Sequence, residues 1–203
     1  MKKFPSIAIL EFQDIPAGLY ATDAMIKKSP IALLKAGIIT GGRYLTLIGG
    51  GTAAVDEAFR EGLFWGKDRL LDHVMLPDIH PQLHEALLGR RNPAASGAMA
   101  IIETATASSN VRAAEMALKG TTVELVEIRL AESRLAGKGL SIFRGELHDI
   151  EAAMDIALSF LRHLKADFQS RVIPSPHETL TDQISGSTFF HDAQLLELDG
   201  EMN

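Results

Sequence analysis

The 203-residue sequence contains no cysteine. This absence excludes thiol catalysis, zinc held by thiolates and iron–sulfur clusters ligated by cysteine. It also fits a reducing compartment. The N-terminal residues lead directly into the first strand-like run without the apolar core of a signal peptide, so we expect a cytosolic protein.

Long apolar runs and an excess of basic residues are also missing. No hydrophobic stretch reaches the roughly 20 residues that a membrane-spanning helix needs. The 20 Lys and Arg residues are outnumbered by 26 Asp and Glu residues, giving a net charge of −6. General nucleic-acid binding depends on a basic surface. We therefore expect neither a membrane nor a nucleic acid among the partners.

The sequence does contain an internal duplication. The stretch Ala-Ile-Leu-Glu at residues 8–11 returns as Ala-Ile-Ile-Glu at residues 100–103, at an offset of 92 residues (100 − 8). After a small insertion the offset becomes 95 residues, with Gly50 matching Gly145 (145 − 50). His80 and His177 close the two copies. The chain is therefore one module used twice.

Each copy follows the order β-α-β-β-α-β. In the first half, strands are predicted over residues 7–12, 31–39, 44–48 and 70–76, and the last strand of the second half over 168–173. Helical spacing of apolar residues follows the first and third strands, and Thr40-Gly41-Gly42 predicts a hairpin. This is the ferredoxin-like order of an α+β fold. The predicted boundaries are 1–89 and 98–190 for the domains, 90–97 for a polar linker and 191–203 for a short tail that is poorly ordered or serves in docking.

These features resemble the tandem-domain, trimer-forming class of bacterial microcompartment shell proteins. The resemblance covers residues 6 to about 80 and 98 to about 177, and it rests on the Glu-bearing first strand, the glycine turn and the closing Ile173-Pro174-Ser175-Pro176-His177. It implies two unpermuted domains, a homotrimer that forms a pseudo-hexameric tile, and other shell proteins as edge-to-edge partners. It further implies location in the shell of a microcompartment in the bacterial cytoplasm, with no catalytic residues and no cofactor.

The resemblance places the hairpin turns around a central pore for small metabolites, with anionic metabolites as candidates. Small residues suit such a position, because converging backbones leave little room for side chains. The longer second turn also carries charged residues, which leads to the hypothesis that it plugs or gates the opening. Basic residues follow both turns, and they either face the pore or begin a strand in solvent. The predicted pore residues are Thr40, Gly41, Gly42, Glu132, Ser133, Arg134, Leu135, Ala136 and Gly137, with Arg43 and Lys138 nearby.

The resemblance assigns Lys27, Lys119, His80 and His177 to the edge of the tile. A solvated lysine on a helix is the alternative for the first pair, although their identical placement in both halves favours the edge. Family members often have Arg between the prolines of the closing motif. This chain has Asp78 and Ser175 in that region instead, so the same contact is not expected.

Two other patterns have alternative interpretations. Glu11 and Glu103 could be catalytic carboxylates, but their duplication favours a repeated structural bond to backbone N–H groups. His80 and His84 are four residues apart, a spacing that could bind a metal, yet no third ligand is evident and Pro81 marks a helix start. We therefore predict no metal site.

The main rival function comes from Gly49-Gly50-Gly51-Thr52-Ala53-Ala54, which fits a dinucleotide fingerprint, with Asp72 about twenty residues later. Glu146 in the second copy would repel a phosphate, and the preceding strand belongs to a hairpin. The alternative function is therefore a tandem ferredoxin-like sensor or enzyme that binds a nucleotide or another small ligand.

Overall fold

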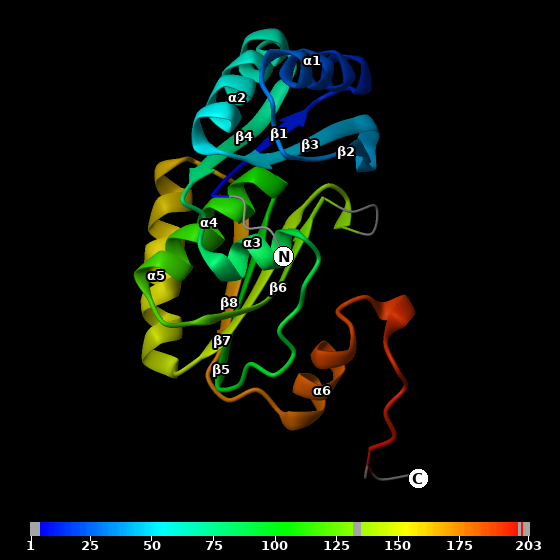
Figure 1. Cartoon of the computed structure of the whole chain (residues 1–203). Helices are drawn as coiled ribbons and strands as arrows, with labels where there is room; N and C mark the ends of the chain where they lie inside the picture. The colour runs from blue at the N-terminus through cyan, green and yellow to red at the C-terminus, as the bar shows by residue number, and fades with distance from the viewer. Residues whose placement is uncertain (1–4, 132–134, 199, 201–203) are drawn as a thin grey trace.

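The computed structural model describes residues 5–131, 135–198 and 200. Two similar halves follow one another along the chain (Figure 1). The first half contains, in order, β1 (Ser6–Phe12), α1 (Ile15–Lys28), β2 (Leu33–Ile39), the 3-10 turn η1 (Thr40–Gly42), β3 (Arg43–Gly50), α2 (Thr52–Gly66), β4 (Leu70–Pro77) and α3 (Pro81–Leu87).

The second half repeats this order. It contains β5 (Ala98–Thr104), α4 (Ala107–Gly120), β6 (Glu124–Leu130), β7 (Gly139–Gly145), α5 (Leu147–His163), β8 (Phe168–Ile173), α6 (Glu178–Gly186) and the 3-10 turn η3 (Phe190–Asp192). The short helices α3 and α6 extend the predicted six-element order. Within the described ranges, no helix is both long and apolar enough to cross a membrane.

The two sheets have the same topology. Their strand orders are β2-β3-β1-β4 and β6-β7-β5-β8, and every pairing is antiparallel. The predicted hairpin is confirmed, since Ile39 pairs with Arg43 across η1. The predicted α+β fold of two tandem ferredoxin-like domains is therefore confirmed.

The start of β2 differs from the prediction, which began that strand at residue 31. Ile31 N donates to the carbonyl of Ser29, and Ala32 N donates to the carbonyl of Gly49. The ladder becomes regular only at Leu33, which pairs with Gly49. Residues 31 and 32 thus belong to the connection between α1 and β2, although their apolar side chains fit the strand pattern.

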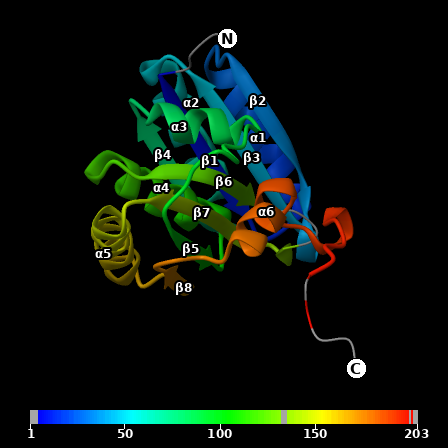
Figure 2. The ribbon, with the colours of Figure 1, turned by 90° about the horizontal axis from the view of Figure 1, so that it is seen from below.

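Both faces of the first sheet are covered, which explains why β1 is buried along its whole length. Ala8, Leu10 and Phe12 pack with residues of α1 and α2, whereas Ile7 and Ile9 belong to a core that continues into the second domain. Alternate residues of a strand point to opposite faces. The first domain therefore offers one sheet face to its own helices and the other to α3 and the second domain (Figure 2).

The boundary between the domains is a packed interface. Helix α3 contacts β6 and α4, and α4 also contacts β4 and β1. Leu83 of α3 and Val111 of α4 are both fully buried. The side-chain oxygen of Gln82 accepts a hydrogen bond from Leu125 N at 2.8 Å, which joins α3 to the edge strand of the second sheet. One of the apolar cores therefore extends across both domains.

Candidate pore turns and the interdomain site

The first hairpin turn is made by Thr40, Gly41 and Gly42. Gly41 has a φ of 78° and Gly42 a φ of 73°, values in the left-handed region that glycine adopts without a steric penalty. No heavy atom lies within 4 Å of the position that a Cβ would take at Gly41 or Gly42. Both glycines are therefore required by the backbone of the turn, and both leave open space around it.

The second turn is described from Leu135 onward. Ala136 and Gly137 have φ values of 50° and 84°, and Lys138 N donates to the carbonyl of Leu135 at 2.9 Å. This turn therefore reverses the chain through two consecutive left-handed residues, as the first does. The predicted pore residues Glu132, Ser133 and Arg134 lie outside the described residues.

The two turns lie side by side in the folded chain. A Cβ at Gly137 would lie 3.2 Å from Nη1 of Arg43 and 3.9 Å from the carbonyl oxygen of Thr40. Residues separated by almost a hundred positions thus meet at one end of the domain boundary. Glycine at position 137 provides the space into which the Arg43 guanidinium extends.

Arg43 faces a buried carboxylate. Its Nη1 lies 3.6 Å from Oε1 of Glu11, whose side chain has no exposed surface. The other carboxylate oxygen, Oε2, accepts a hydrogen bond from Ala107 N at 3.0 Å. Glu11 therefore joins the first domain to the N-terminal turn of α4 in the second. This contact is the predicted bond from a backbone N–H group to the Glu11 carboxylate.

The pKa of the Glu11 carboxyl is raised to about 7, chiefly because the side chain is buried, and the nearby Asp72 carboxylate contributes to the rise. The Ala107 N–H and the Arg43 guanidinium act in the opposite direction. The effect of burial prevails because a carboxylate loses its hydration in the interface, while Oε1 has no hydrogen-bond partner within the described part of the chain.

The repeat-equivalent Glu103 has different surroundings. Its side chain is 38% exposed, and its Oε1 lies 2.7 Å from Nζ of Lys138. This ion pair raises the pKa of Lys138. The predicted repetition of the Glu11 bond is therefore not seen in Glu103 within a single chain. Both basic residues beside the turns nevertheless pair with the glutamate of the first strand of their own domain.

Asp72 is a second polar link between the domains, a role that was not predicted from the sequence. Its Oδ2 accepts hydrogen bonds from Thr106 Oγ1 at 2.5 Å and from Ser109 Oγ at 2.7 Å. Thr106 caps α4 by accepting from Ser109 N. The only signal in the sequence was the capping threonine, because the pairing of Asp72 with α4 follows from the packing of the two domains.

Asp72 is not placed to complete a nucleotide fingerprint. It pairs with Glu11 at one end of β1, whereas Gly50 pairs with Ser6 at the other end. A Cβ at Gly50 would lie 3.2 Å from Ala32 N, so this glycine is explained by close packing of the backbone. The two parts of the fingerprint are therefore separated along the sheet.

The predicted edge lysines occupy equivalent places on α1 and α4. Lys27 pairs with Asp23 at 2.5 Å, and Lys119 pairs with Glu115 at 2.7 Å, each one helical turn apart. The ion pair with Asp23 raises the pKa of Lys27. Both Glu115 oxygens also accept from the backbone N of His80, at 3.1 and 3.2 Å. Lys119 and His80 are thus brought together across the domain boundary.

The duplicated histidines begin the short helices. His80 Nδ1 accepts from Gln82 N, and His177 Nδ1 accepts from Thr179 N, each at 3.3 Å. An imidazole nitrogen that accepts a backbone N–H is engaged as a helix cap. Across the ranges that the structure describes, no three His, Cys, Asp or Glu side chains are grouped as a metal site.

Comparisons with known proteins agree with this architecture. A family model described as the BMC domain matches the chain twice, at residues 6–79 and 98–176. The bacterial microcompartment shell protein PduT of Citrobacter freundii is 31% identical over 179 residues, covering 88% of this chain and 97% of that protein.

Two solved structures are also similar. A microcompartments protein from Desulfitobacterium hafniense has 32% identity and a TM-score of 0.76, with 87% of this chain and 98% of that chain covered. The fused permuted hexameric shell protein MSM0275 from the RMM microcompartment has 23% identity and a TM-score of 0.54, over 81% and 88% of the two chains. The second comparison shows likeness of fold alone.

Proposed function

The chain belongs to the BMC-domain family of bacterial microcompartment shell proteins, and from this premise we propose that three copies close into a pseudo-hexagonal tile with a central pore. The observation that carries this proposal is a mismatch in burial between the two halves. Residues that are buried at the domain boundary in one half are apolar and exposed in the other.

Helices α1 and α4 show the mismatch most clearly. Leu19 is 53% exposed, while its counterpart Val111, at the offset of 92, is fully buried against the first domain. Ile26 is 46% exposed, while its counterpart Leu118 is 3% exposed. An exposed apolar face that repeats a buried one is the expected mark of a missing neighbour.

Helices α3 and α6 show the complementary mismatch. Leu83 is fully buried between the domains, whereas its counterpart Leu180, at an offset of 97 (180 − 83), is 40% exposed. Suppose that the second domain of one protomer packs on the first domain of the next as the two domains of one chain do. Helix α6 then covers the exposed side chains of Leu19 and Ile26, and Leu180 becomes buried. A head-to-tail contact of this kind generates a ring when its rotation closes.

Closure of the ring would bring the hairpin turns together at the axis. Within one chain the two turns already lie side by side, with Gly137 against Arg43. Repetition of that contact would surround the opening with glycine-rich backbone. The ion pairs of Arg43 with Glu11 and of Lys138 with Glu103 would hold basic groups beside it. We propose that these groups favour small anions during passage.

The same repetition would place Lys27 beside His177 of the neighbouring copy, as Lys119 lies beside His80 within one chain through Glu115. We propose that Lys27 and Lys119 lie along the outer edges of the tile, where they meet adjacent tiles. The proposed role is structural, with no reaction assigned to any side chain.

The experiment is a measurement of mass in solution with variants of α1. Wild-type protein should be a trimer by light scattering, and Ile26→Glu should shift it toward monomer without unfolding it. Phe64→Glu is the matched control, because Phe64 is 62% exposed and its counterpart Ser159, at the offset of 95, is exposed as well. A monomeric wild-type protein, or equal effects of the two variants, would refute the ring.

Passage of ions is tested with Arg43→Ser and Lys138→Ser. Binding or permeation of a small carboxylate should fall relative to that of a cation of similar size. Unchanged preference in the double variant would show that the two basic residues do not face the opening.

A further inference from the structure

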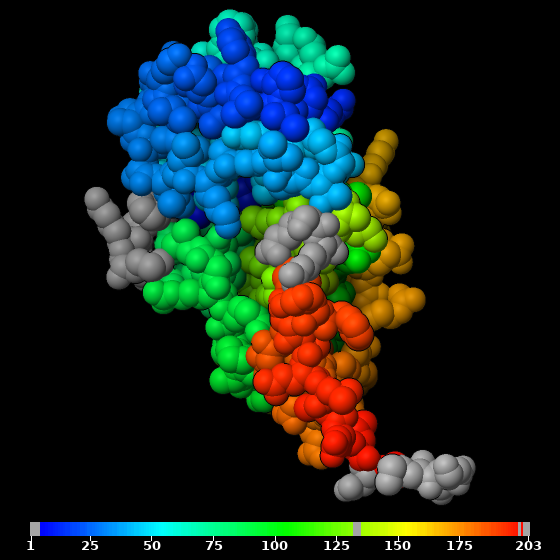
Figure 3. Space-filling view, turned by 90° about the vertical axis from the view of Figure 1, so that its right-hand side faces the viewer, coloured from blue at the N-terminus to red at the C-terminus, as the bar shows by residue number. Residues whose placement is uncertain are grey.

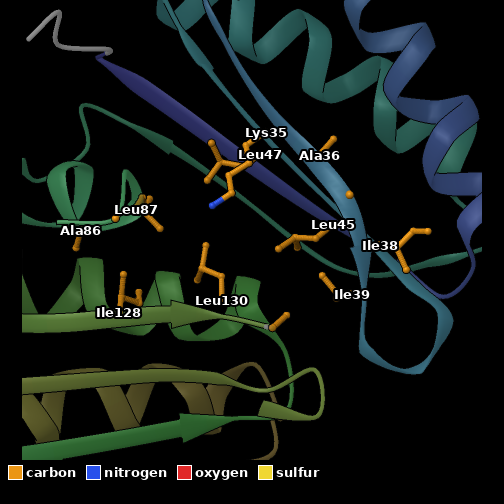
Figure 4. A pocket seen from close by; sticks show the side chains of 13 residues that line it. Lys35, Ala36, Ile38, Ile39, Leu45, Leu47, Ala86, Leu87, Ile128 and Leu130 are labelled. Atoms are coloured by element: carbon orange, nitrogen blue, oxygen red, sulfur yellow. The ribbon is translucent and has the colours of Figure 1, made fainter. Parts of the chain in front are cut away.

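An apolar groove lies between the hairpin of the first domain and the edge strand of the second, and the chain does not fill it. The groove has a volume of about 460 Å³ and lies between the hairpin β2–β3 on one side and α3 and β6 on the other (Figure 4). Its lining includes Lys35, Leu45, Leu47, Leu87, Ile128 and Leu130. The side chains of Leu45 and Leu47 point toward those of Ile128 and Leu130 across the open space (Figure 4).

The equivalent place in the second domain is occupied. Leu47 and Ile142 are equivalent in the two halves, at the offset of 95 (142 − 47). Lys35 pairs with Leu47 and Glu127 pairs with Ile142, so Lys35 and Glu127 hold the same position in their hairpins. Gly37 and Arg129 likewise correspond, because they pair with Leu45 and Leu140.

The segment after α6 covers this place in the second domain. Thr188 Oγ1 donates to Glu127 Oε2 at 3.0 Å and accepts from Arg129 Nε at 2.9 Å. The ring of Phe189 lies 3.7 Å from Cζ of Arg129. The second domain thus uses an aromatic residue from the chain end to cover its sheet.

The first domain cannot use its own chain in this way. After α3, the chain leaves for the second domain, where Arg91 bonds to Glu127 and Asn92 N donates to the carbonyl of Val126. Gly37 has no side chain, and no heavy atom lies within 4 Å of the position of a Cβ there. The groove therefore has space for a large apolar side chain where Arg129 lies in the second domain.

The C-terminal segment has the matching chemistry. Phe190, Leu195 and Leu198 are 97%, 94% and 67% exposed, and the segment runs outward from the body of the molecule (Figure 3). Glu197 lies among these leucines. Lys35 in the groove has no carboxylate partner among the residues that the structure describes. Residues 195–198, which are apolar apart from the Glu197 carboxylate, complement an apolar groove with one cation.

We propose that residues 190–198 of one copy bind in the groove of the first domain of the neighbouring copy. The inference rests on the proposed ring, in which α6 lies over the next first domain as α3 lies over β6. The segment that follows α6 would then begin beside that groove. Each protomer would give its chain end to one neighbour and receive that of the other, so that six domains have covered sheets.

The absence of cysteine from the chain permits a direct test by disulfide trapping. The double variant Leu45→Cys with Leu195→Cys is oxidised mildly and analysed on a non-reducing denaturing gel, while light scattering gives the mass before oxidation. Covalent dimers and trimers should form rapidly. The control pair Phe64→Cys with Leu195→Cys should give at least tenfold less, because Phe64 lies on α2, away from the groove.

The outcomes separate the tail contact from the ring. A trimeric protein that forms no covalent oligomers, or forms them no faster than the control pair, overturns the inference and leaves the ring standing. A disulfide closed within one chain also overturns it, because the tail then fills its own groove. Covalent oligomers from a protein that is not a trimer support the tail contact and overturn the ring.

A charge exchange tests the assignment of Lys35 and Glu197. Lys35→Glu should slow trapping in the cysteine pair severalfold, and adding Glu197→Lys should restore the rate. Slowing without restoration would overturn the pairing of these two residues, since a general disturbance of the groove would not be rescued by the tail.

Discussion

Replacing Glu11 by Gln should remove a large part of the pH dependence of stability. The pKa of Glu11 rises from its ordinary value of 4.5 to about 7 in the folded protein. The folded state therefore holds this proton more tightly than the unfolded chain does. The favourable contribution is fully present below about pH 4.5, declines as the pH rises, and is lost above about pH 7.

The magnitude follows from the two pKa values. A rise from 4.5 to about 7 corresponds to about 3 kcal/mol, at RT ln 10 for each pH unit. The wild-type free energy of unfolding should therefore fall by up to this amount between about pH 4.5 and pH 7, relative to that of Glu11→Gln. The amide cannot ionise, although its oxygen can still accept the hydrogen bond from Ala107 N.

The assay is urea unfolding followed by circular dichroism at several pH values and one fixed protomer concentration. Glu57→Gln is the control, because Glu57 has an exposed side chain on α2 and should leave the wild-type slope intact. Arg43 and Asp72 are unchanged in both variants, and their interactions with the Glu11 carboxylate are part of the effect that the comparison measures. Parallel pH profiles for wild type and Glu11→Gln would refute the reasoning that burial dominates at this site.

Three further predictions concern the packing. Leu83→Ala should lower the free energy of unfolding by about 2–5 kcal/mol in urea titrations, because it empties a fully buried site; Leu180→Ala should instead weaken the trimer in dilution experiments, and equal effects on folding would contradict the burial difference. Gly62→Ala should lower the melting temperature, since its Cβ would lie 2.6 Å from Met25 Sδ, whereas Gly186→Ala meets no atom within 4 Å and should not. Thr106→Ala should cost about 1–2 kcal/mol by calorimetry, because it removes both the cap of α4 and a bond to Asp72; a change within error would show that the interface does not depend on this hydroxyl.

The repeat made most of the fold predictable from the sequence. Matching offsets placed the strands and helices of one half by comparison with the other, and the glycines of residues 41 and 42 located the hairpin. Their positive φ values are the physical reason for that signal. Boundaries were less certain, as the start of β2 shows, because hydrophobicity alone does not reveal where a chain leaves a helix and enters a ladder.

The candidate site was only partly predictable. Repetition indicated that Glu11 and Glu103 share a role, but it could not show that one is buried by the second domain while the other faces outward. The bonds from Asp72 to α4 were also missed. Such differences depend on which surfaces meet, and that information is spread over residues far apart in the sequence.

Fusion of two modules in one chain lets equivalent positions diverge. In a ring of single-domain chains, every copy of a position must carry the same residue, because symmetry repeats it. Here the same place under the sheet carries Gly37 in one half and Arg129 in the other, and only the second half is covered by Phe189. A ring of three such chains would alternate open and covered grooves. The exposed end of each chain is then the available means of covering the open ones, which connects the duplication to the tail contact proposed above.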